Sequence, residues 1–127
     1  MSQTQILIRF KQLLVAFNNE LVSQFPSVPD FKLGRVMLNT PGLEKFLLDR
    51  LVEHFDRTDI DIRRLVADRD ENYFRHNNPF TFISDERAAK MVMLWDSGVL
   101  DQGDKDVMWV WIDAFLLVAD KYRLATC

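Results

Sequence analysis

The side chains best suited to chemistry in this chain are two histidines and one cysteine, and they are far apart in the sequence. Neither His54 nor His76 has a serine, a cysteine or a second histidine nearby to form a nucleophile or a metal-ligand set, and Cys127 is the terminal residue. A glycine-rich phosphate loop and the GxSxG, HExxH and paired CxxC motifs are absent. We therefore expect both histidines at the surface or in a loop, and a protein that is not an enzyme and has no cofactor.

The nearest approach to a metal site is the acidic segment DRDENYF. Asp68, Asp70 and Asn72 alternate as the ligands of a calcium-binding loop do. However, Tyr73 stands where the sharp turn requires glycine, and Pro79 stands where the loop needs a bidentate glutamate. We therefore expect no metal here and interpret the segment as a solvated acidic turn whose aspartates cap a helix.

Arginines are concentrated just before and within this acidic segment. Arg63, Arg64 and Arg69 lie near Tyr73 and Phe74, a combination that could form a charged contact surface for phosphate or nucleic acid. Acidic residues are interleaved with them: Asp56, Asp59, Asp61, Asp68, Asp70 and Glu71. A surface of salt bridges is the stronger interpretation. Because the formal net charge is −3, we do not expect nucleic acid as a partner.

Bulk composition predicts one globular domain, residues 1–127, folded in a reducing compartment. The chain is 48% hydrophobic and 28% charged and is long enough to bury a real core. Its single cysteine cannot form an internal disulfide. The apolar residues at the N-terminus are spaced and interrupted by Arg9 and Lys11, unlike those of a signal peptide. We therefore expect an intracellular protein that is not secreted.

Helical periodicity dominates the chain and predicts an all-α fold. Apolar residues recur at intervals of three and four, and proline, glycine and capping residues separate the segments. The expected helices run from Thr4 to Phe25, Asp30 to about Asn39, Thr40 to about Phe55, Ser84 to Gly98 and Asp104 to about Leu124, with one or two short helices between Asp59 and Asn77. The prediction is a compact bundle of about five main helices with a hydrophobic C-terminal helix.

The C-terminal helix is the most apolar segment. From Val107 to Ala119 every residue is apolar except Asp113, yet 13 residues give roughly 20 Å of helix against the ~30 Å of a bilayer core, so we expect no membrane span. Three aspartates fall on one line of this helix: Asp106, Asp113 and Asp120. The apolar arc opposite spans roughly 220°, with Trp111 at its centre and Trp109 on its flank. Two interpretations stay open, a central core helix or a helix with one flank docked on another protein.

Two sets of residues are candidates for binding a protein partner, including a second copy of this chain. Trp109, on the flank of the C-terminal helix, and Trp111 are the candidate anchors, because tryptophan is enriched at such anchors, although the central position of Trp111 in the arc favours a core role for it. A crevice lined by Met91, Val92, Trp95 and Met108 could instead accept an amphipathic partner helix, because methionine adapts to such surfaces.

Three stretches of the chain carry a family pattern: IRFKQLLVAFNNELVSQFPSVPDF, then YF after an Asp-rich turn, then KMVMLWDSGVLDQGDKDVMWVWIDAFLLVADKY. In this order they resemble a family of small helical proteins of large nucleocytoplasmic DNA viruses, of the algal-virus and iridovirus type. The matching positions are Phe10, Leu13, Phe17, Leu21, Phe25, Pro26, Trp95, Trp109, Ile112, Phe115, Leu116, Val118, Ala119 and Tyr122.

This resemblance implies a viral, non-enzymatic protein with no catalytic residues to transfer. It implies a virion-associated role, such as a minor capsid or assembly component, or action on a host or viral protein partner. The expected location is the cytoplasm of an infected host cell, the virion, or both. The alternative is a regulatory helical module that binds an amphipathic helix of a host or viral partner in a hydrophobic groove.

Overall fold

The structure, a computed structural model, describes residues 2–77, 80 and 85–126. Every regular helix or strand in these ranges is an α-helix, which confirms the all-α prediction. In chain order the helices are α1 (Gln3–Gln24), α2 (Pro29–Met37), α3 (Leu43–Phe55), α4 (Ile62–Ala67), α5 (Asn72–Asn77), α6 (Asp85–Asp96) and α7 (Gln102–Thr126). No helix in this part of the chain is long and apolar enough to cross a bilayer.

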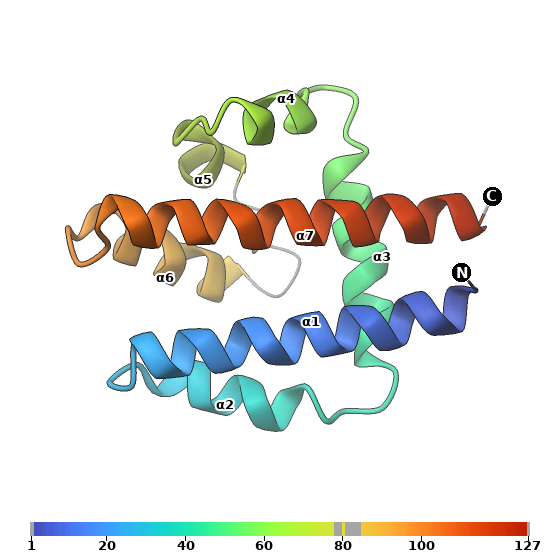
Figure 1. The fold of residues 1–127 in the computed structure, drawn as a ribbon, viewed down its shortest axis with the longest axis horizontal. Coiled ribbons are helices and arrows are strands. Elements are labelled where there is room, and N and C mark those ends of the chain that lie inside the picture. The colour runs from blue at the N-terminus through green and yellow to red at the C-terminus, as the bar shows by residue number, and fades with distance from the viewer. Residues whose placement is uncertain (1, 78–79, 81–84, 127) are drawn as a thin grey trace.

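The two longest helices, α1 and α7, lie side by side and run in opposite directions (Figure 1). Helix α3 crosses behind both of them, and α2 packs along α1 on the side away from α7. Helices α4 and α5 lie beyond α7, and α6 lies behind it. The N-terminal and C-terminal halves of the chain therefore share one core, because the first and last helices pack together at its centre.

Helix α1 begins and ends where local chemistry requires. The Ser2 hydroxyl accepts a hydrogen bond from the Gln5 backbone N–H at 3.2 Å, and the Ser2 backbone N–H donates to Oε1 of Gln5 at 2.9 Å. This reciprocal capping box satisfies two N–H groups that the first turn leaves unpaired. The helix ends at Gln24, and Phe25 adopts a non-helical conformation before Pro26. Between these two ends, helix α1 presents one apolar stripe to the core.

The core is a single cluster to which all seven of the described helices contribute. An aromatic group lies at its centre: the ring of Phe17 on α1 stacks on Phe80 at 5.5 Å and meets Phe115 of α7 edge-on at 5.4 Å. Phe115 also meets Phe10 edge-on at 6.2 Å. Such pairs add to the stability that burial alone supplies, so α1 and α7 are held in one register.

Candidate functional site

Trp109, the expected anchor for a partner, belongs to this core. Its side chain is 3% exposed, and its ring lies 5.9 Å from Trp95 and 6.2 Å from Tyr73. The guanidinium of Arg69 lies over the ring at 5.5 Å. Helices α5 and α6 supply this cover, and a side chain enclosed by its own chain cannot dock on another protein. The expected docking role of Trp109 is therefore corrected to a packing role.

The positions of the two tryptophans on α7 are the reverse of the expectation. Trp111, expected at the centre of the buried arc, is only half-buried, with its ring 5.2 Å from Phe17 of α1. The centre of the buried face passes through Met108, Ile112, Phe115, Ala119 and Tyr122. The cause is tertiary: Tyr73 of α5 and Trp95 of α6 pack on Trp109, whereas Trp111 packs on Phe17 of α1.

The crevice expected along α6 and α7 is not formed by the residues named for it. Trp95 and Met108 are buried in the core. Met91 does line a pocket, but its companions there come from α1, α2 and α3. Met91 is itself only 6% exposed, so all four of the candidate residues Trp109, Trp95, Met91 and Met108 are buried, and Met91 alone among these four lines the pocket.

Arg63 and Arg69 are tied to acidic residues of this chain. The two terminal nitrogens of Arg69 donate to the two carboxylate oxygens of Asp113 on α7, at 2.9 and 2.7 Å. Arg63 donates to the backbone carbonyl of Phe55 at 2.8 Å and also bonds Asp120 of α7. These carboxylates raise the pKa of both guanidinium groups. The two arginines therefore attach α4 and the turn after it to the aspartate line of α7.

Arg64 differs from these two arginines because its side chain is 78% exposed and its ion pair with Asp68, at 3.7 Å, is long.

The acidic segment that resembled a calcium loop contributes a helix cap, since Asp70 accepts a hydrogen bond from the Asn72 N–H at 3.0 Å. Within the described residues no group of three His, Cys, Asp or Glu side chains is placed to hold a metal ion.

His54 forms a partly buried pair with Tyr73, contrary to the surface position expected for it. Its Nε2 lies 2.7 Å from the hydroxyl of Tyr73, a side chain with no exposed surface. Burial, together with the positive charge of Arg57, lowers the pKa of His54 to about 4, and burial raises the pKa of Tyr73. A neutral imidazole and a protonated phenol are the forms that this site favours. The pair joins α3 to α5.

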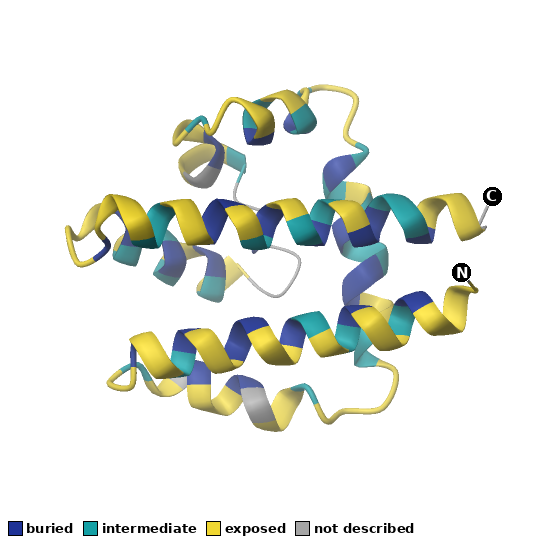
Figure 2. Cartoon of the chain, viewed as in Figure 1, coloured by how far each residue is buried: buried dark blue, intermediate teal, exposed yellow. Residues whose placement is uncertain are grey.

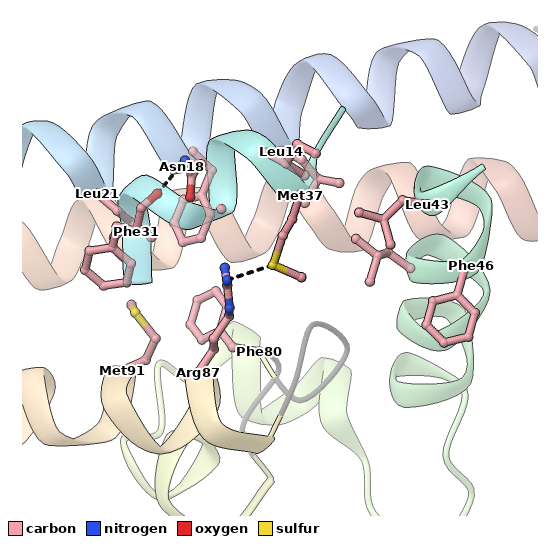
Figure 3. Close-up of a pocket in the computed structure, with 14 residues that line it drawn as sticks. Leu14, Asn18, Leu21, Phe31, Met37, Leu43, Phe46, Phe80, Arg87 and Met91 are labelled. Carbon is pink, nitrogen blue, oxygen red and sulfur yellow. Dashed lines mark hydrogen bonds between the residues drawn. The ribbon is translucent and has the colours of Figure 1, made fainter. Parts of the chain in front are cut away.

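A concave apolar surface forms a pocket between α1, α2, α3 and α6, with a volume of about 210 Å³ (Figure 3). We call it the apolar pocket. Its lining consists of Leu14, Phe17, Asn18, Leu21, Phe31, Gly34, Met37, Leu38, Leu43, Phe46, Leu47, Phe80, Arg87 and Met91. All of these are apolar except Asn18 and Arg87. A concave apolar surface with a few placed polar groups is the usual form of a binding site.

Close packing of α2 on α1 forms one wall of the apolar pocket. A Cβ atom on Gly34 would lie 2.5 Å from Oδ1 of Asn18, so only glycine allows this approach. Asn18 is the one buried polar residue among those described, and its Nδ2 donates to the Phe31 carbonyl at 3.0 Å. This bond orients the amide group of Asn18 in the lining of the pocket.

The rim of the apolar pocket exposes large apolar side chains to solvent. Met37 of α2 is 47% exposed and Phe46 of α3 is 57% exposed. Arg87 of α6 reaches across toward α2, and its Nη2 donates to Sδ of Met37 at 3.1 Å (Figure 3). The guanidinium of Arg50 lies 5.7 Å from the centre of the Phe46 ring. Exposed methionine and aromatic groups around a cavity are typical of a surface that receives other apolar groups.

A second apolar feature lies on the outer side of α7. Its exposed residues Val107, Val110, Leu117 and Leu124 recur at intervals of three and seven, so they form one line along the helix. This line, which we call the outer row, is opposite the buried face. Figure 2 shows exposed positions recurring along the outer side of both α1 and α7. The outer row is convex, so it can contribute contact area but cannot enclose a side chain.

The comparisons with other proteins add no relatives to this description. No protein-family model, no curated protein and no solved structure matches the chain. The fold and the site define an all-α protein with an apolar pocket between four helices and a cation in its lining.

Proposed function

We propose that this protein is a non-enzymatic interaction module that binds an amphipathic helix of a host or viral protein in the apolar pocket. The observation that carries the proposal is the pocket itself, which is lined almost entirely by apolar side chains and has the exposed Met37 and Phe46 at its rim. Helix-in-groove binding buries the apolar face of one helix in such a surface.

The size of the pocket suits the side chains of a helix. Its volume of about 210 Å³ exceeds the roughly 150 Å³ of an engineered apolar cavity that binds benzene. One large apolar side chain, or two smaller ones a helical turn apart, would fill it. The remaining apolar face of the partner would then pack on Met37 and Phe46, as neighbouring contacts surround the anchor in other interfaces.

The lining chemistry supports binding rather than catalysis. Among the described lining residues the polar side chains are Asn18 and Arg87. Asn18 donates to the Phe31 carbonyl, and Arg87 carries a guanidinium group, which has donors and no acceptor. These two groups do not include a nucleophile or a general base, so the described part of the pocket offers orientation and charge to a ligand.

We also propose that the chain forms one domain, with α1, α2, α3, α6 and α7 as its main bundle. Four of these helices enclose the apolar pocket, and α7 is the hydrophobic helix that carries much of the core. The proposed setting is the cytoplasm of an infected cell, which rests on the resemblance to proteins of large DNA viruses.

A library of displayed helical peptides tests the proposal. We expect selection on the wild-type protein to enrich peptides with apolar residues at positions i, i+3 or i+4, and i+7. Leu43→Trp, which fills the apolar pocket, should weaken their binding at least about tenfold. Leu33→Trp, on the exposed side of α2, is the matched control and should bind as the wild type does.

Circular dichroism and thermal melting first establish that both tryptophan variants are folded. Met37→Trp, at the exposed rim, replaces Leu43→Trp if the latter does not fold. Selected peptides that bind the pocket-filled variant as tightly as the wild type, or a selection that enriches no peptide, would contradict the proposal.

A second candidate function, a virion-associated structural protein that assembles with itself, is favoured by the outer row of α7. A line of exposed apolar residues along a long helix can pair with a second copy. Light scattering should then find wild-type protein as a dimer or larger species and Val110→Glu as a monomer. Monomeric wild-type protein at roughly 100 μM, a concentration at which even weak self-association is visible, would exclude this candidate.

A further inference from the structure

The methionines in the described part of the chain differ in exposure and in position. Met91 and Met108 are each only 6% exposed, whereas Met37 is 47% exposed and Met93 is 70% exposed. Of the two exposed methionines, Met37 lines the apolar pocket, and Met93 lies on α6 outside its lining. The rim of the pocket therefore contains an exposed thioether, and the chain provides a second exposed thioether away from the pocket.

The thioether of Met37 lies where α2 faces α6 across the apolar pocket. Met37 is the last residue of α2, and its Sδ accepts a hydrogen bond from Nη2 of Arg87 at 3.1 Å (Figure 3). This bond uses one of the two lone pairs of the sulfur. Oxidation of methionine adds an oxygen atom at a sulfur lone pair, so an exposed thioether with its second lone pair available is a site for this reaction.

We propose that oxidation of Met37 regulates the apolar pocket: conversion of its thioether to a sulfoxide weakens binding of the partner helix. This inference rests on the proposed function and adds a regulation to the same site. The oxidant is a peroxide. Hydrogen peroxide transfers one oxygen atom to Sδ, so its O–O bond breaks, an S=O bond forms, the thioether loses two electrons and the peroxide is reduced to water. Methionine sulfoxide reductases reverse the step with thiols as the electron source, so the regulation is reversible.

Oxidation changes the rim of the pocket from apolar to polar. In the proposed complex the apolar face of the partner helix packs on Met37 and Phe46. The oxygen of a sulfoxide is hydrated in the free protein, and covering it with apolar groups costs free energy. The interior of the pocket stays apolar, because Met91 is enclosed and is expected to react more slowly. The effect of oxidation is therefore a loss of affinity that arises at the rim.

Binding measured before and after treatment with hydrogen peroxide tests this inference. The probe is a helical peptide selected on the wild-type protein and free of methionine, cysteine and tryptophan, so that only the protein is oxidised. We expect its affinity for the wild-type protein to fall about tenfold after oxidation and to return after treatment with methionine sulfoxide reductases. Met93→Leu, the matched control, should show the same fall. In Met37→Leu the affinities before and after oxidation should agree within about twofold.

Peptide mapping by mass spectrometry measures the extent of oxidation at each methionine, and circular dichroism measures the helix content of each oxidised protein. Cys127 is present in all three proteins, so its oxidation affects them alike. Sulfoxide at Met93 without sulfoxide at Met37 would overturn the inference. A loss of affinity that accompanies a loss of helix content would also overturn it, because oxidation would then act through unfolding.

The remaining outcomes separate this inference from the proposed function. If Met37 is fully oxidised and the peptide binds as tightly as before, the pocket binds helices but the regulation is overturned. If Met37→Leu loses as much affinity on oxidation as the wild type, another group is responsible, and the inference is again overturned. If selection on the reduced protein yields no peptide that binds, the proposed function fails together with the inference.

Discussion

Replacing Trp109 by glutamate is expected to destabilise the fold severely. The Trp109 ring is enclosed by Trp95, Tyr73 and Arg69, so the variant loses a large buried side chain and leaves a carboxylate in its place. Truncating a buried tryptophan costs about 3–5 kcal/mol, and a buried carboxylate without a full set of partners adds to this loss. Because small domains are stable by about 5–15 kcal/mol, this loss removes a large part of the stability, and near the lower end of that range it removes nearly all of it.

The neighbouring substitution Val110→Glu is the matched control. Val110 is 62% exposed on the same helix, so, at a protein concentration low enough to keep the chain monomeric, the same new side chain should change the free energy of unfolding by less than about 0.5 kcal/mol. Urea unfolding followed by far-ultraviolet circular dichroism measures both variants. A Trp109→Glu protein that unfolds at the wild-type urea midpoint would show that Trp109 is not enclosed as described.

Acid is expected to destabilise the fold through His54. The pKa of His54 is about 4 in the folded chain, well below the ordinary value of about 6.5 that applies to the unfolded chain. Between these values the unfolded state binds more protons than the folded state, so stability rises with pH. The contribution of His54 is fully present above about pH 6.5 and is lost as the pH falls toward 4, which amounts to about 2–3 kcal/mol.

Two single variants isolate this histidine from the other groups that titrate in acid. In His54→Gln, which keeps a polar partner for the hydroxyl of Tyr73, the fall in unfolding free energy between pH 7 and pH 4 should be smaller than in the wild type by about 2–3 kcal/mol. In His76→Gln, where the replaced side chain is exposed, the fall should match the wild type. Equal pH dependence in His54→Gln and wild-type protein would contradict the buried pair.

Much of the secondary structure could be predicted because its signals are local. Gly98 was expected to close the fourth main helix, and it adopts a φ of 81°, a conformation that glycine reaches without strain. The start of α3 was predicted less well. The third helix was expected to start at Thr40, but Gly42, with a φ of 79°, precedes a helix that begins at Leu43. The ends of a helix are predicted less reliably from a sequence than the helix itself.

The error over the two tryptophans has a physical cause. They are two residues apart on one helix, so they point to opposite flanks of a wide apolar arc. Periodicity locates the arc, but the burial of Trp109 depends on where α5 and α6 pack, and those contacts are distant in sequence. The ion-pair partners of the arginines could not be predicted for the same reason. Salt bridges were expected from the interleaved charges, but Arg69 binds Asp113, 44 residues away.

Most residues of the candidate site could not be predicted from the sequence. Met91 was the one pocket residue named, because α6 contributes only part of the lining and the rest comes from three other helices. Gly34 was an available signal, since a glycine inside a helix often marks a close approach of another helix. Its effect depends on Asn18, which faces it across the α1–α2 contact.

The most direct test of the apolar pocket as a binding site is a titration of protein labelled with ¹³C at its methionine methyl groups, followed by NMR with a peptide selected on the wild type. Met37 and Met91 line the pocket, whereas Met93 is exposed and Met108 lies in the core. We predict that the methyl signals of Met37 and Met91 shift on binding and that the signal of Met93 does not. Shifts confined to Met93, or unchanged signals at both pocket methionines while the peptide binds, would place the binding surface elsewhere and contradict the proposal.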